Sequence, residues 1–135
     1  MVNRRPLDRS APAAAPELGR LIAVLFAAGA PLWRSLAASV TVDRPVVVCD
    51  AVSPAQIAVL TASPDLVVDG LVVVARALGV HRVYLRTPSG IGSVAVRRAL
   101  SRRGDPVRIV VEQHDRPGDV VHEASDYVRL AQLVA

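Results

Sequence analysis

The sequence predicts an α/β fold: a small three-layer Rossmann-like domain with a mainly parallel sheet and crossover helices. Short apolar runs alternate with longer segments at helical spacing, which is typical of right-handed parallel crossovers. The clearest run lies in residues 44–54, RPVVVCDAVSP, where three valines lead into Cys49 and Asp50. Such a run indicates a strand buried on both faces. Because ligands of these sheets bind beyond the carboxyl ends of the strands, we expect a site around residues 50–54.

The chain divides into two parts by composition. Residues 1–16 carry Arg, Pro, Ser and Ala without periodicity, and we expect them to form a disordered leader. With 135 residues in total, the chain is long enough for one domain with a real core. We expect residues 17–135 to form that single domain.

The expected elements alternate along the chain. In order they are helix 17–28, helix 32–40, strand 44–50, helix 64–80, strand 81–87, helix 91–103, strand 107–113 and helix 120–134, with 51–63 as a loop or an irregular helix. Glu17 favours the amino end of the first helix dipole, and Gly29 followed by Pro31 ends that helix.

The segment 64–80 is the clearest helix. Ser63 is a candidate N-cap, Pro64 occupies the first helical position, and Gly79 ends the helix. Its polar residues Asp65, Asp69 and Arg76 fall on one stripe, so the helix is expected to be buried on most sides.

The second half of the chain repeats the alternation. The turn at 88–90 follows the second strand, and Gly104 and Pro106 end the helix 91–103, which has Val96 and Ala99 on its inner face. A Pro117-Gly118 turn precedes the last helix. Three strands make a small sheet, so either a fourth strand is hidden in a segment interpreted as loop or another surface covers the edge.

The charge pattern argues against nucleic-acid binding and membrane insertion. The 16 basic residues are all arginines spread along the chain, the net charge is +4, and aromatic residues make up only 3%. The apolar run 21–33 is too short to span a bilayer. A signal peptide is the alternative for this region, with Arg4, Arg5 and Arg9 as the basic part, 21–30 as the apolar part and 37–39 as the cleavage site.

Reactive side chains are expected at the carboxyl ends of the strands. They are Cys49, Asp50, Arg86, Thr87, Gln113, His114 and Asp115. A single cysteine excludes an internal disulfide and a cysteine-ligated metal site within this chain, and it fits a reducing cytoplasm. Cys49 is interpreted as a buried apolar residue, and a Cys49–His114 thiol hydrolase is the minor alternative.

Two further features are weaker signals. His114 and His122 lack metal-ligand spacing and are interpreted as solvated or capping residues. The small-residue segments 27–31 and 89–92 could approach a phosphate. One glycine and a proline more often mark a helix end, and 89–92 lacks the third glycine of a dinucleotide loop.

Six stretches of the chain carry a family resemblance in their order. They are AAGAPLWRSL at 27–36, VCDAVSP at 48–54, LVVDGLVVVARALGV at 66–80, VYLR at 83–86, AVRRALSRRG at 95–104 and HEASDYVRL at 122–130. Together they resemble the FMN-binding core of the NADH-oxidising flavoprotein subunit of bacterial complex I and its NAD-linked hydrogenase and formate dehydrogenase relatives. There the first, second and last stretches read G-R-G-G-A-G-F-P, N-A-D-E-x-E-P and G-E-E-T/S-A.

The resemblance implies a diverged NADH dehydrogenase flavoprotein-subunit-like protein that transfers electrons from NADH through FMN in the cytoplasm. It implies FMN and NAD(H) as cofactors, and redox-complex subunits or a second copy of the chain as partners. The implied cofactor-binding residues are Gly29, Trp33, Arg34, Asp50, Ser53 and Glu123. No catalytic or metal-binding residue is implied. The family's ubiquitin-like and iron–sulfur domains have no counterpart here, so we expect no iron–sulfur cluster in this chain.

The chain departs from the family at several cofactor contacts. Ala28 and Ala30 stand where the loop has glycines, and their methyl groups restrict the approach of backbone to a phosphate. Ala51, Ser53 and Ala124 replace glutamates that would accept hydrogen bonds. These losses favour an alternative function: a cofactor-free structural or interaction module with the same fold.

Overall fold

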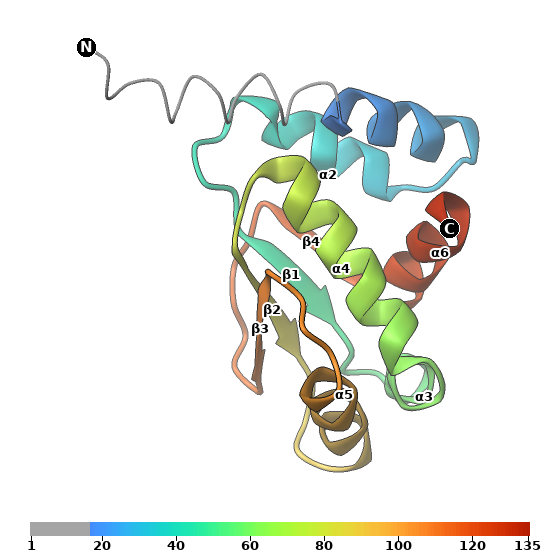
Figure 1. The fold of residues 1–135 in the computed structure, drawn as a ribbon, viewed down its shortest axis with the longest axis vertical. Helices are drawn as coiled ribbons and strands as arrows, with labels where there is room; N and C mark the ends of the chain where they lie inside the picture. The colour runs from blue at the N-terminus through green and yellow to red at the C-terminus, as the bar shows by residue number, and fades with distance from the viewer. Residues whose placement is uncertain (1–16) are drawn as a thin grey trace.

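The computed structural model describes residues 17–135, and Figure 1 shows a sheet with helices packed against it. The sheet has four parallel strands in the order β3-β2-β1-β4. Their bounds are β1 Val47–Asp50, β2 Arg82–Arg86, β3 Arg108–Glu112 and β4 Val120–Glu123. The predicted α/β class with a parallel sheet is therefore confirmed. The expected leader, 1–16, lies outside the described residues.

The helices follow the expected order. A helix covers residues 17–27, and the later ones are α2 Leu32–Ala38, the 3₁₀ turn η2 Ser39–Thr41, α3 Pro54–Ala62, α4 Pro64–Leu78, α5 Ile91–Ser101 and α6 Ala124–Val134. α4 ends at Gly79, whose left-handed φ of 72° closes the helix as predicted. Ser63 occupies the N-cap position of α4, but its side chain makes no capping hydrogen bond.

Two segments differ from the sequence-based expectation. The expected helix 120–134 is wrong in its first four residues, which form β4, so the fourth strand lies in a segment expected to be helix and not in one interpreted as loop. The physical reason is the pairing with β1, which buries Val120 completely and leaves Val121 39% exposed, a strand alternation. The segment 51–63 contains a regular helix, α3, because the Ser53 side chain caps its first turn by accepting from the Gln56 N–H.

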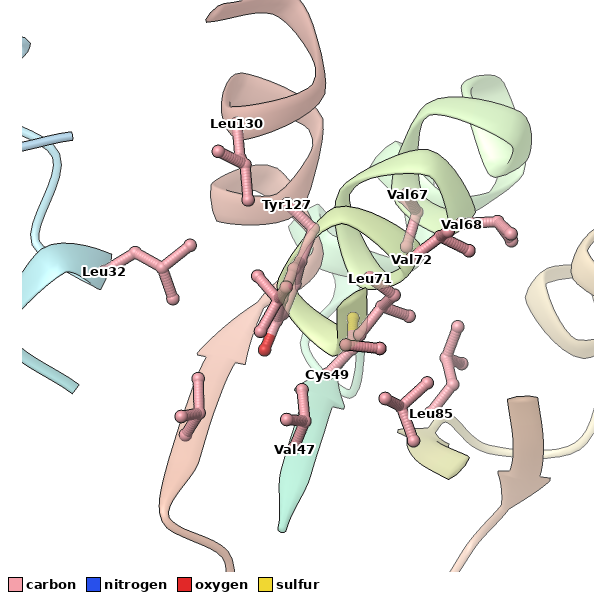
Figure 2. Packing of buried hydrophobic residues seen from close by; sticks show 14 of the residues in the cluster. Leu32, Val47, Cys49, Val67, Val68, Leu71, Val72, Leu85, Tyr127 and Leu130 are labelled. Carbon is pink, nitrogen blue, oxygen red and sulfur yellow. The ribbon is translucent and has the colours of Figure 1, made fainter. Parts of the chain in front are cut away.

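The core lies between the sheet and the helices. Val47, Cys49 and Leu85 are fully buried and belong to one apolar cluster with residues from every helix. Figure 1 shows α4 crossing in front of β1, with α6 beside it. Figure 2 shows Leu71 of α4 and Tyr127 of α6 directed toward the same face of the strands.

The other face of the sheet is crossed by the loop 113–119, in the place where a doubly wound fold usually has a helix. This loop returns the chain from β3 to β4. Its Arg116 guanidinium stacks over the Tyr84 ring at 3.8 Å, and its Asp119 backbone N–H donates to the Val46 carbonyl at 2.9 Å. The Asp119 carboxylate accepts from the Val46 N–H at 2.7 Å. The layer on this face is therefore thin, but it is fixed to β1 and β2.

The polar stripe of α4 is used to hold the end of α5. Arg103, which follows α5, donates to Asp69 at 2.6 Å and to Asp65 at 3.3 Å, and it also pairs with Asp105 at 2.6 Å. Its side chain is only 19% exposed, and these carboxylates raise the pKa of its guanidinium. The carboxylates of the α4 polar stripe are thus about half exposed, because a charge-assisted network with Arg103 covers the rest of their surface.

Candidate functional site

The strand order places a topological switch point between β1 and β4. The chain runs from β1 to β2 and β3, and then returns to the opposite side of β1. In α/β proteins ligands bind in the crevice that opens at such a reversal, beyond the carboxyl ends of the strands. Asp50 ends β1, Glu123 ends β4, and the two are register partners. The structure therefore brings together two of the six implied cofactor-binding residues.

The Gly29 loop forms the carboxyl cap of the helix 17–27. Gly29 has a left-handed φ of 69°, its N–H donates to the Phe26 carbonyl, and the Ala30 N–H donates to the Leu25 carbonyl at 3.0 Å. This is the Schellman arrangement, which satisfies the last helical carbonyls. The Ala28 carbonyl accepts from Arg129 of α6 at 2.6 Å. The loop N–H groups that would bind a flavin phosphate are thus used within the helix end.

Trp33 and Arg34 lie on the first turn of α2, close to this loop. The Trp33 ring is half-buried and meets the Phe26 ring edge-on, with centroids 5.1 Å apart. The Arg34 guanidinium lies 5.6 Å from the centre of the Trp33 ring and is exposed. No hydrogen bond or ion pair joins either side chain to Asp50 or Glu123 within the described part of the chain. The aromatic ring therefore serves packing.

Asp50 is engaged by a neighbouring strand. Its carboxylate accepts from Arg86, the next strand's last residue, at 3.4 Å, and Arg86 also lies 3.9 Å from Asp115. The side chains of Asp50 and Arg86 are 33% and 26% exposed. The Asp50 carboxylate thus has a cationic partner on the β2 side.

A side-chain contact joins α3 to α6 across the switch point. Ser53 caps α3, and the Gln56 amide in the same turn makes two hydrogen bonds to Ser125 at the start of α6. The Gln56 oxygen accepts from the Ser125 N–H at 2.8 Å, and its nitrogen donates to the Ser125 hydroxyl at 3.1 Å. Sequence reasoning missed this contact because it joins residues 69 positions apart.

Glu123 caps α6 through a reciprocal capping box. Its side chain accepts from the Asp126 N–H, while the Asp126 carboxylate accepts from the Glu123 N–H at 3.2 Å. His122 lies between two partners, with Nδ1 3.4 Å from Asp126 and Nε2 2.7 Å from the Ser35 hydroxyl. Its hydrogen bond holds the pKa of Asp126 below the usual value. The spacing of Glu123 and Asp126 was the sequence signal for this cap.

Cys49 behaves as an apolar core residue. It is fully buried beneath the helices, as Figure 2 shows, and burial raises the pKa of its thiol well above the usual value. A thiol kept protonated is a poor nucleophile. His114 is exposed and lines a cavity that Cys49 does not line. The geometry therefore favours the interpretation of Cys49 as a buried apolar residue.

An open cavity of about 480 Å³ lies beside β3 and the amino end of α5. Its lining gathers side chains from the carboxyl ends of the strands with those of α5: Thr87, Ser89, Ser93, Arg97, Val111, Glu112, Gln113 and His114. Of the reactive residues expected at this edge, Thr87, Gln113 and His114 meet here, away from Cys49. The cavity is separate from the six implied cofactor residues.

Two features are absent from residues 17–135: a cluster of metal-ligating side chains and a single helix of membrane-spanning length. These residues contain no group of three or more His, Cys, Asp or Glu side chains placed to hold a metal ion. None of their helices is by itself long and apolar enough to cross a membrane, and α3 and α4 reach that length only together, across a 95° bend.

Comparison with known proteins gave no match to any family model, curated protein or solved structure. The likeness to the complex I flavoprotein subunit therefore rests on the six sequence stretches.

The backbone groups that the resemblance assigns to FMN already have partners within the chain. The Gly29 loop uses its N–H groups to cap a helix, and the first turn of α6 is occupied by Glu123 and Gln56. Backbone N–H groups in a loop or at the start of a helix are the donors that a phosphate needs. In both places these groups are satisfied by the chain itself.

Proposed function

We propose that this protein is a non-redox member of the Rossmann-like fold, which acts as a structural or interaction module without FMN. The observation that carries the proposal is the Gln56–Ser125 contact, which closes the switch point with side chains of the protein. A ligand that bound the first N–H groups of α6 would have to displace this contact, because the Ser125 N–H already donates to the Gln56 oxygen. Its partners are other protein chains or a second copy of this one.

Purified protein tests the proposal directly. We expect its visible spectrum to lack the flavin bands after expression in a host that supplies FMN, and we expect no further band after incubation with added FMN followed by desalting. The Gln56→Ala variant is the matched comparison, because it removes the contact and keeps the Ser53 cap of α3. Stoichiometric FMN in the unmodified protein would overturn the proposal.

NADH oxidation through FMN is the competing function. The observation in its favour is the register pairing of Asp50 with Glu123, which puts two carboxylates at the switch point as the resemblance requires. This function requires NADH-dependent reduction of a dye by the FMN-incubated protein, and the loss of that reduction in Asp50→Asn. The non-redox proposal expects equal background rates for both proteins, so a rate that depends on Asp50 decides against it.

A further inference from the structure

We propose that the cavity between β3 and the amino end of α5 binds the phosphate group of a small phosphorylated ligand. This inference is independent of the non-redox function, because it concerns residues outside the β1–β4 switch point. At about 480 Å³ the cavity is within the range of small-molecule sites.

The first observation is the amino end of α5. This eleven-residue helix starts after Gly90, which has a φ of 138° and provides no side-chain cap. The N–H groups of the first turn of a helix have no partner within the helix, and they carry the positive end of its dipole. Such an end is a common site for phosphate.

The second observation is a buried hydroxyl with no partner. Thr87 is 2% exposed and lines the cavity, yet its Oγ1 makes no hydrogen bond to any described residue. A Cβ atom built on Gly92, in the first turn of α5, would lie 3.5 Å from this oxygen. A buried hydroxyl without a partner costs stability, and this one lies in the wall of the cavity beside the first turn of α5, where a bound anion would bring an acceptor.

The charges around the cavity favour an anion on the α5 side. Arg97 donates through Nε to the Ser93 hydroxyl at 3.2 Å, and this holds its guanidinium beside the first turn. No carboxylate of residues 17–135 pairs with Arg97. Glu112 also lines the cavity, but Arg116 binds both of its oxygens, at 2.5 and 3.0 Å, and lowers its pKa. The planar N–H groups of the Arg97 guanidinium are spaced to donate to two oxygens of a phosphate.

Titration with inorganic phosphate and with ribose 5-phosphate, followed by amide NMR shifts, tests the site. We expect saturable shifts at Gly92 and Ser93 with both probes. Tighter binding of ribose 5-phosphate indicates a phosphate ester, and equal binding indicates the free ion as ligand. The Arg97→Gln variant should weaken binding about tenfold, the effect of losing one charge-assisted hydrogen bond. Arg98 is an exposed neighbour outside the cavity, so the Arg98→Gln variant should leave the affinity for phosphate unchanged.

The Thr87→Val variant separates a binding role from a structural one. Because the hydroxyl has no partner in the ligand-free protein, its replacement by a methyl group should leave the melting temperature unchanged or raise it, while phosphate binding weakens severalfold. The proposal is overturned if the shifts at Gly92 do not saturate, if Arg98→Gln weakens binding as much as Arg97→Gln, or if Thr87→Val leaves binding intact.

Discussion

Replacement of Gly70 by alanine should destabilise this protein by about 3 kcal/mol, the upper end of the usual cost of overpacking. Gly70 lies where α4 crosses α6, and a Cβ atom there would overlap the carbonyl oxygen of Tyr127 and lie 2.7 Å from its carbonyl carbon. These are backbone atoms, so the clash is relieved only if the two helices move apart. That movement would loosen the buried contacts on both sides of the crossing.

Gly19→Ala is the matched control for this change. Gly19 lies in the helix 17–27, and a Cβ atom there would meet nothing within 4 Å. Alanine should therefore stabilise the protein by about 0.5–1 kcal/mol, through its higher helix propensity. Urea unfolding followed by circular dichroism measures both effects. A Gly70→Ala protein as stable as the unmodified one would show that α4 and α6 do not approach this closely.

Tyr127→Phe should cost about 1–2 kcal/mol at neutral pH, because it leaves a buried carbonyl without its partner. Tyr127 is fully buried in α6 and donates to the Val48 carbonyl of β1 at 2.9 Å. Figure 2 shows the side chain reaching from α6 down to the strands. The loss should appear as a lower urea midpoint with an unchanged slope, because the same surface is exposed on unfolding.

The same tyrosine should make the fold sensitive to alkali. Burial raises the pKa of Tyr127 well above the usual value, and that of Cys49 likewise. Above the unfolded-state pKa, about 8.5 for Cys and 10 for Tyr, only the unfolded chain releases these protons. The free energy of unfolding therefore falls as pH rises, by up to about 1.4 kcal/mol per pH unit for each group.

Urea unfolding between pH 7 and pH 11 measures this dependence. The decline should begin near pH 8.5 with Cys49 and steepen above about pH 10 with Tyr127. Tyr127→Phe should remove the steepening, and Cys49→Ala the earlier part. Equal pH profiles for the unmodified protein and Tyr127→Phe would mean that the tyrosine hydroxyl is accessible to water.

The elements that local chemistry defines were predictable from the sequence. Pro64 and Gly79 marked α4, and the run of valines before Cys49 marked β1. β4 was missed because Val120–Glu123 leads directly into α6 without a glycine or proline between them. Only its pairing with β1 distinguishes this strand from a first helical turn, and a pairing across more than 70 residues leaves no local signal.

Only part of the candidate site was predictable from the strand pattern. Asp50 was expected at the carboxyl end of a strand, whereas Glu123 was expected within the helix 120–134 and reaches the same edge only because β4 pairs with β1. The partners of these residues depend on the tertiary fold: Arg86 comes from β2, and Gln56 reaches α6 from α3. Gly29 was correctly predicted to end the helix. Only the Schellman geometry in the structure shows that the N–H groups of this loop donate to helix carbonyls and are therefore not available to a phosphate.

Calorimetric titration of the purified protein with FMN tests the central claim most directly. The claim is that side chains of the protein close the β1–β4 switch point, and that the Gly29 loop is a helix cap. It predicts no saturable heat for the unmodified protein. One-to-one FMN binding that is weakened by Asp50→Asn would contradict it, because the flavin would then occupy the place now held by the Gln56–Ser125 contact.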